Sequence, residues 1–213
     1  IIENSNKKTL LIDCSTIDIE SIKTVGIKAN QYNMNIIDAP VSGGVVGADN
    51  GTLTFMVGGN EESFNLALPI LNNMGKKVVH AGDLGSGLAA KICNNMILGI
   101  SMIALSESFT MAKKLGLDQN KFFEISSKAT GMSWAMLNHL PVAGIIETAA
   151  ANKGFKPGFA ASMMVKDLSL AQASAASVNL NTPIGSLALD MYKDFVKQGN
   201  GDLDYTAIIK LIE

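Results

Sequence analysis

The residues best suited to binding an anion are Ser42-Gly43-Gly44, which follow a short apolar segment containing Asp38. Glycines let backbone N–H groups converge without hindrance from side chains, and the serine hydroxyl adds a further donor. Such a turn at the carboxyl edge of a sheet suits a carboxylate or a phosphate. A bulged turn leading into a hairpin is the commoner explanation for these glycines, and the pattern alone leaves both open.

A lysine inside an apolar helical segment is the strongest candidate for proton transfer. Small residues at 85–87 open this segment, Lys91 follows one turn later, and Asn95 comes four residues after Lys91. Residues i and i+4 share one helix face, so the amine and the amide can act together. Burial favours the neutral amine, which can accept a proton. The alternative is a lysine that extends into solvent at a domain edge, against which the expected burial of Asn94 and Asn95 argues.

Three weaker candidates complete the polar inventory. Lys166-Asp167 places a cation and its own carboxylate in another apolar helix, and the residues alone favour a solvated surface pair. Thr16 follows the first expected strand and could hydrogen-bond a nucleotide there, although a helix cap is the commoner role. The two histidines, His80 and His139, stand far apart, so we expect no metal site.

The elements that must position these residues change character near residue 83. Before it, apolar strand patterns at 9–14, 35–39, 52–57 and 77–81 alternate with helical patterns at 18–33 and 61–74, and Asp49-Asn50-Gly51 indicates a hairpin turn. After it, only helices are expected, at about 84–115, 119–128, 160–178, 183–197 and 205–212, with a loop-rich segment at 141–157. We therefore expect an α/β domain over 1–82 and an all-helical domain over 83–213, joined by the long helix.

Composition narrows the class of protein. Apolar residues make up 47% of the 213 residues and charged residues 17%, which is typical of a globular protein. A net charge of −2 without basic runs argues against nucleic-acid or membrane-surface partners. The apolar segment 88–105 is interrupted by Lys91 and two asparagines, so we expect a buried helix rather than a membrane span. Cys14 and Cys93 are expected to be reduced, buried thiols of an intracellular protein.

One expected feature of a dinucleotide-binding sheet does not occur in this sequence. The glycine-rich fingerprint G-x-G-x-x-G is absent; Gly85-Ser-Gly87 comes closest, but the third glycine and a later ribose-binding acid are missing. The front also has too few strands for a complete doubly wound sheet. Because the chain begins Ile-Ile-Glu-Asn rather than with Met, we expect an internal start, with the dinucleotide half of the sheet outside it.

Three motifs in order resemble the 3-hydroxyisobutyrate dehydrogenase branch of the β-hydroxyacid dehydrogenase family. Residues 37–44 (IDAPVSGG) with 51–59 (GTLTFMVGG) resemble its substrate-binding signature, and residues 85–95 (GSGLAAKICNN) resemble the segment that carries its catalytic lysine. Residues 159–168 (FAASMMVKDL) resemble the helical segment whose lysine approaches the cofactor. The similarity extends over about 10–205, nearly the whole chain.

The resemblance assigns roles that the residue patterns leave open. It implies that Lys91 is catalytic with Asn95 as its partner and that Ser42, Gly43 and Gly44 bind the substrate carboxylate. It also implies that Thr16 and Lys166 contact NAD, which is the only basis for naming that cofactor.

The implied function is NAD-dependent oxidation of 3-hydroxyisobutyrate to methylmalonate semialdehyde in valine degradation, impaired in a chain without the dinucleotide half. Tartronate semialdehyde and glyoxylate reductases share the motifs and stay open. A noncatalytic family relative or an oligomerising helical fragment also stays open. The long apolar helix predicts homodimers or homotetramers, and a bacterial cytoplasm or a mitochondrial matrix fits reduced thiols.

Overall fold

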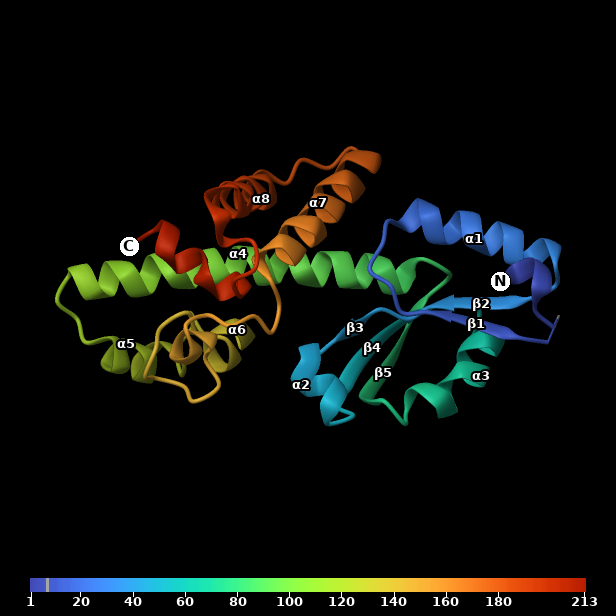
Figure 1. Cartoon of the computed structure of the whole chain (residues 1–213), viewed down its shortest axis with the longest axis horizontal. Helices are drawn as coiled ribbons and strands as arrows, with labels where there is room; N and C mark the ends of the chain where they lie inside the picture. The colour runs from blue at the N-terminus through green and yellow to red at the C-terminus, as the bar shows by residue number, and fades with distance from the viewer. Residues whose placement is uncertain (7) are drawn as a thin grey trace. The chain divides into compact units, whose positions relative to one another are not determined.

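The computed structural model describes residues 1–6 and 8–213, which form two compact units, 1–94 and 95–213. The first unit is built on a five-stranded mixed sheet (Figure 1). Its strands are β1 (Leu10–Asp13), β2 (Asn35–Asp38), β3 (Val41–Ser42), β4 (Leu53–Gly58) and β5 (Gly75–Gly82). Strands β1 and β2 are parallel, as are β4 and β5, whereas β4 is antiparallel to both β2 and β3.

Helices cover both faces of this sheet. They are α1 (Ile19–Gln31), α2 (Gly44–Asp49) and α3 (Glu61–Leu71), with a short 3-10 turn at Ile2–Asn4. Successive side chains of β2 point to opposite faces: Ile36 packs with the α1 side of the sheet and Ile37 with the α3 side. The two faces therefore bury separate apolar clusters, as in other α/β domains.

The second unit is helical. The long helix α4 (Ser86–Lys114) contributes its residues from 95 onward. The other elements are α5 (Gln119–Ser126), α6 (Trp134–Asn138), a 3-10 turn (Ala150–Lys153), α7 (Ala161–Ser177), α8 (Pro183–Phe195), a wider turn (Val196–Asn200) and a final 3-10 helix (Tyr205–Leu211). Gly99 of α4 lies against Met164 and Leu168 of α7, so the two helices approach closely. One large apolar cluster, which includes the buried Phe109 and Tyr192, forms the core.

The expected fold class is confirmed: an α/β front of Rossmann type is followed by a helical unit. The expected strands and helices occur within a few residues of their predicted ends. Helices α2 and α6 were not expected, because each is at most six residues long and lies among turn-forming residues.

The prediction of buried thiols was wrong, since Cys14 and Cys93 are both exposed. Helix α4 is long and apolar enough to cross a bilayer by length and composition, but its apolar side chains also build the core of the second unit.

The partly buried His139 ties the end of the chain to the helical core. The Nδ1 atom of His139 lies 2.8 Å from the hydroxyl oxygen of Tyr205, and the His139 ring packs edge-on against Trp134. Burial lowers the pKa of His139, and the nearby Asp204 offsets only part of that effect. Burial also raises the pKa of Tyr205 well above its ordinary value, so its hydroxyl stays protonated.

The lowered pKa of His139 predicts a loss of stability in mild acid. The unfolded chain takes up a proton as the pH falls through about 6.5, whereas the folded chain does so only at its lower pKa, so acid favours unfolding in that window. Urea unfolding between pH 7.5 and 5.5 measures this slope. His139→Gln should flatten it, and His80→Gln removes the other histidine as a control; equal slopes for the two variants would contradict the assignment.

Candidate active site

The carboxylate of Asp38 holds the beginning of α4 against the end of β2. Asp38 is fully buried; its Oδ1 accepts a hydrogen bond from the Gly85 backbone N–H and its Oδ2 one from that of Leu88, both at 2.7 Å. A helix begins with unsatisfied N–H groups, and Gly85, which precedes α4, has no side chain with which to cap them. A residue 47 positions earlier in the chain therefore supplies the cap.

Glycines allow this approach. A β-carbon at Gly87 would overlap the carbonyl oxygen of Met56 and would lie 2.8 Å from Asp38 Oδ2. A β-carbon at Gly58 would also overlap the Asp38 carboxylate. The segment Gly85-Ser-Gly87, which comes closest to a nucleotide-binding fingerprint, thus serves the packing of α4 on β4. The close packing explains why glycines occur here, and no bound phosphate is needed to account for them.

This packing brings Lys91 to the predicted anion-binding turn. Lys91 is half-buried one turn after Leu88, and its Nζ donates a hydrogen bond of 2.7 Å to the carbonyl oxygen of Val41. Val41 immediately precedes Ser42, so the amine lies beside the turn that begins there. The Lys91 side chain is therefore not extended into bulk solvent, as the alternative interpretation required.

The turn at Ser42-Gly43-Gly44 has the backbone conformation that glycine permits. Gly43 has φ 139° and Gly44 has φ 61°, both in the region that other residues rarely adopt. The turn begins α2 and does not run directly into a hairpin, although β3 and β4 do pair, with Ser42 opposite Thr54. Gly43 and Gly44 are exposed while Ser42 is half-buried. Their backbone is accessible to a small anion.

The second unit contains the remaining predicted site residues, Asn95 and Lys166, together with Asp167. Asn95 is 3% exposed and its side-chain amide donates to Oδ2 of Asp167, which is itself 3% exposed. The Lys166 Nζ lies 3.2 Å from Asp167 Oδ1, and the Lys166 side chain is half exposed. The interpretation of Lys166-Asp167 as a solvated surface pair is therefore wrong for Asp167. The expectation that Asn94 is buried is also wrong, since it is exposed.

Thr16 lies in the loop between β1 and α1. The cap of α1 is Asp18, whose side chain accepts from the Ser21 backbone N–H, so Thr16 does not have the capping role that its position suggested. The loop begins with a hydrogen bond of 2.8 Å from the Ser15 N–H to Asp13 Oδ1. Thr16 is thus placed at the carboxyl end of β1, where α/β sheets bind their ligands.

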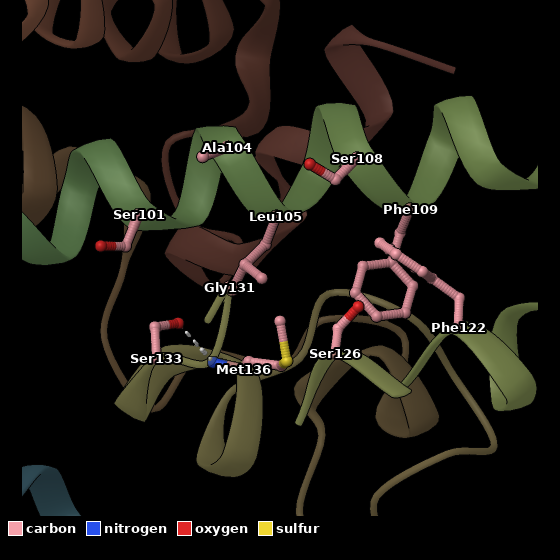
Figure 2. A pocket seen from close by; sticks show the side chains of 10 residues that line it. All are labelled: Ser101, Ala104, Leu105, Ser108, Phe109, Phe122, Ser126, Gly131, Ser133 and Met136. Carbon is pink, nitrogen blue, oxygen red and sulfur yellow. Dashed lines mark hydrogen bonds between the residues drawn. The ribbon is translucent and has the colours of Figure 1, made fainter. Parts of the chain in front are cut away.

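The second unit contains a pocket of about 320 Å³ (Figure 2). It is lined by α4, α5, α6 and the loop before α6, and apolar side chains such as Leu105 and Phe109 dominate its wall. None of the predicted site residues lines it. Among the described residues no group of three or more His, Cys, Asp or Glu side chains could hold a metal ion.

The family matches assign this arrangement, an α/β unit followed by a helical unit, to the NAD(P)-dependent oxidoreductases. Residues 85–212 match the family described as the NAD-binding domain of NADP-dependent 3-hydroxyisobutyrate dehydrogenase. Residues 1–82 match the NAD-binding domain of 6-phosphogluconate dehydrogenase. The chain belongs to the 3-hydroxyisobutyrate dehydrogenase family. NAD(P) is accordingly its cofactor.

Relatives of this chain occur in bacteria and in mitochondria. It is 45% identical to a probable 3-hydroxyisobutyrate dehydrogenase of Mycobacterium tuberculosis over 94% of this chain and 68% of the relative. It is 44% identical to the mitochondrial 3-hydroxyisobutyrate dehydrogenase of Drosophila melanogaster, over 98% of this chain and 64% of that protein. The structure of the M. tuberculosis 3-hydroxyisobutyrate dehydrogenase with L-serine superposes with a TM-score of 0.96 at 42% identity, covering 100% of this chain and 73% of the other.

Sequence reasoning gave no separate role to Asp38 and interpreted Asp167 only as the surface partner of Lys166. Both are carboxylates in apolar surroundings, and a buried carboxylate needs hydrogen-bond donors. That signal could have marked Asp38, which follows two isoleucines in β2. The hydrogen-bond donors to the two carboxylates could not be identified from the sequence, since they lie 47 and 72 residues away in the chain.

Asp38→Asn should destabilise the first unit by about 2–3 kcal/mol, because an amide nitrogen faces a backbone N–H donor in place of an acceptor. Asp18→Asn is the matched control: it changes the same atoms at an exposed cap, where asparagine caps as well as aspartate. Urea unfolding followed by circular dichroism measures both. An equally small change for the two variants would show that the buried cap contributes little.

Proposed function

We propose that the full-length gene product is an NAD-dependent dehydrogenase that oxidises 3-hydroxyisobutyrate to methylmalonate semialdehyde, a step of valine degradation. One observation carries the proposal: the Lys91 amine lies 2.7 Å from the carbonyl of Val41, beside the Ser42-Gly43-Gly44 turn. An amine beside an anion-binding turn can meet the hydroxyl of a substrate whose carboxylate occupies the turn. Family membership supports this arrangement.

The chemistry follows from these positions. Oxidation of a β-hydroxyacid removes a hydride from the carbinol carbon and a proton from its hydroxyl. NAD⁺, when bound, accepts the hydride. Lys91 in its neutral form accepts the hydroxyl proton and then donates a hydrogen bond to the carbonyl oxygen that forms. Asn95, one helical turn along α4, orients the reacting groups.

Substrate binding uses the backbone of the turn. The N–H groups of Gly43 and Gly44 and the hydroxyl of Ser42 bind the carboxylate, which fixes the distance between it and the carbinol carbon. Only glycine tolerates the backbone angles at these two positions without strain. The preference for acids with the hydroxyl on the β-carbon is taken from the family of the chain.

The residues of this chain fit part of a dinucleotide site. In the parallel unit β1-α1-β2, Thr16 lies in the loop that joins β1 to α1, and such loops at the carboxyl ends of strands take nucleotides in α/β sheets. Thr16 would hydrogen-bond the cofactor there, and Lys166 of α7 is the second proposed cofactor contact. No G-x-G-x-x-G turn for a pyrophosphate occurs in residues 1–213. We therefore expect these residues expressed alone to bind NAD weakly and to have little activity.

L-Serine is the second candidate substrate, because the similar M. tuberculosis structure is described with it. L-Serine and 3-hydroxyisobutyrate share a carboxylate and a primary β-hydroxyl, and they differ at the α-carbon, which carries an ammonium or a methyl group. The Ser42-Gly44 turn and Lys91 recognise only the shared part. Discrimination between the two acids therefore depends on contacts to the α-substituent.

An NAD-reduction assay tests the function. The full-length gene product should reduce NAD⁺ with 3-hydroxyisobutyrate at a higher kcat/KM than with L-serine or glycerate. Lys91→Met should lower kcat by about 10²- to 10⁴-fold with little change in the unfolding midpoint, because proton transfer is lost while the apolar stem remains.

The matched control is Lys121→Met, which neutralises a 70% exposed lysine of α5 and should leave kcat unchanged. A Lys91→Met enzyme with most of its activity would refute the catalytic assignment. A higher kcat/KM with L-serine would change the proposed substrate to L-serine and would leave the proposed mechanism unchanged.

We also propose that the helical unit self-associates as a homodimer or homotetramer. Helix α4 carries exposed apolar side chains, among them Ile97 (64% exposed) and Met111 (60%). Closed symmetric assembly is the common way to cover such surfaces. This property would hold even if the chain were noncatalytic.

Light scattering on residues 1–213 should give a mass of at least twice 22.4 kDa. Met111→Lys places a charge on the exposed face of α4 and should shift the mass toward the monomer, while Lys121→Met should not. A monomeric mass for the parent chain at high micromolar concentration would exclude assembly through this unit.

A further inference from the structure

A buried carboxylate on α7 takes no part in the chemistry described above. Asp167 is 3% exposed and lies among apolar side chains of the helical core, including Met164 and Leu168. Burying a carboxylate is costly unless donors surround it. Asp167 has a hydrogen-bond donor, the side-chain amide of Asn95 at Oδ2, and an ion-pair partner, the Nζ of Lys166, which lies 3.2 Å from Oδ1.

The bond between Asp167 and Asn95 has a direction. An ionised carboxylate only accepts hydrogen bonds, whereas an amide has a donor nitrogen on one side and an acceptor oxygen on the other. The Asn95 nitrogen must therefore face Asp167, because the reverse orientation would set two oxygens against each other. The Asn95 oxygen is consequently turned away from Asp167.

Both partners of Asp167, the hydrogen-bond donor Asn95 and the ion-pair partner Lys166, are residues to which the proposed function gives a role. Asn95 lies one turn after Lys91 on α4, and Lys166 is the proposed cofactor contact on α7. The Asn95 amide is buried, so its bond to Asp167 is little weakened by solvent. The Lys166 side chain is 42% exposed, so its ion pair contributes less. The main effect of Asp167 is therefore expected at Asn95.

We propose that Asp167 is a positioning residue for the reaction: it fixes the orientation of the Asn95 amide, so that Asn95 offers an oxygen acceptor to an N–H or O–H of the reacting groups. The proposal rests on the proposed dehydrogenase function. It gives the buried carboxylate a role that core packing does not require, because an apolar side chain would fill the same space without a desolvation cost.

The substitution Asp167→Asn tests the proposal, since it keeps the shape of the side chain but lets Asn95 turn either way. In the full-length gene product we expect kcat for 3-hydroxyisobutyrate to fall by about 10- to 100-fold, with a smaller change in KM. Asn95→Ala should have a similar effect. In the Asn95→Ala background, Asp167→Asn should then change kcat less than threefold, because the group on which it acts is gone.

Two control variants separate the alternatives. Asp190→Asn makes the same chemical change at an exposed position of α8 and should leave kcat unchanged. Lys166→Met tests the ion-pair partner of Asp167. If Asp167→Asn lowers kcat in the Asn95→Ala background but not in the Lys166→Met background, Asp167 acts through Lys166 and the proposal is wrong. Additive effects of Asp167→Asn and Asn95→Ala on kcat would also refute it, as expected for a carboxylate that only stabilises the core.

A spectroscopic measurement makes the test independent of activity. The side-chain NH₂ signal of Asn95 in a ¹⁵N-correlated NMR spectrum, assigned by its loss in Asn95→Ala, should shift in Asp167→Asn and stay in place in Asp190→Asn. An unshifted signal would overturn the positioning role. A shifted signal in a protein that oxidises no β-hydroxyacid would instead refute the proposed function, on which the positioning role rests.

Discussion

The two hydrogen bonds from the start of α4 to Asp38 set the geometry of the first unit. They join the end of β2 to the first turn of the longest helix, and the glycines at 58 and 87 let the two backbones approach closely enough to form them. Lys91 lies one turn further along that helix. Its amine reaches the carbonyl of Val41 only because the helix begins where Asp38 holds it. A shift of the helix by one residue would rotate Lys91 by about 100° away from the turn.

The helical unit also contains a buried carboxylate that accepts a hydrogen bond from a distant segment, but its donor is a side-chain amide and not a backbone N–H group. Asp167 is buried and accepts from Asn95, so a carboxylate again links two segments that are far apart in the chain. Such bonds are directional, whereas apolar packing is not. In each unit apolar clusters provide the core, and one buried carboxylate specifies how a helix or side chain that carries a proposed site residue is held.

Family membership and geometry answer different questions about this protein. The matches to two NAD-binding families and the 0.96 TM-score place the chain among 3-hydroxyisobutyrate dehydrogenases and identify NAD(P) as the cofactor. They do not distinguish 3-hydroxyisobutyrate from L-serine. In the proposed mechanism that choice depends on the groups around the α-carbon, because the turn at Ser42 and the amine of Lys91 would meet features common to both acids.

The sequence determined which residue types could do the chemistry and which elements carry them. Apolar periodicity predicted the α/β front, the helical unit and α4, and local spacing placed Lys91 and Asn95 on one helix, because strand and helix periods depend on neighbouring residues alone. Short helices such as α2, the exposure of Cys14 and Cys93 and the burial of Asp167 could not be predicted, since they depend on what the rest of the chain covers. Only the tertiary structure decided that Asp38 caps α4, that Lys91 reaches Val41 and that Asp167 holds Asn95. These bonds span 47 to 72 residues, and no local pattern specifies which distant groups will meet.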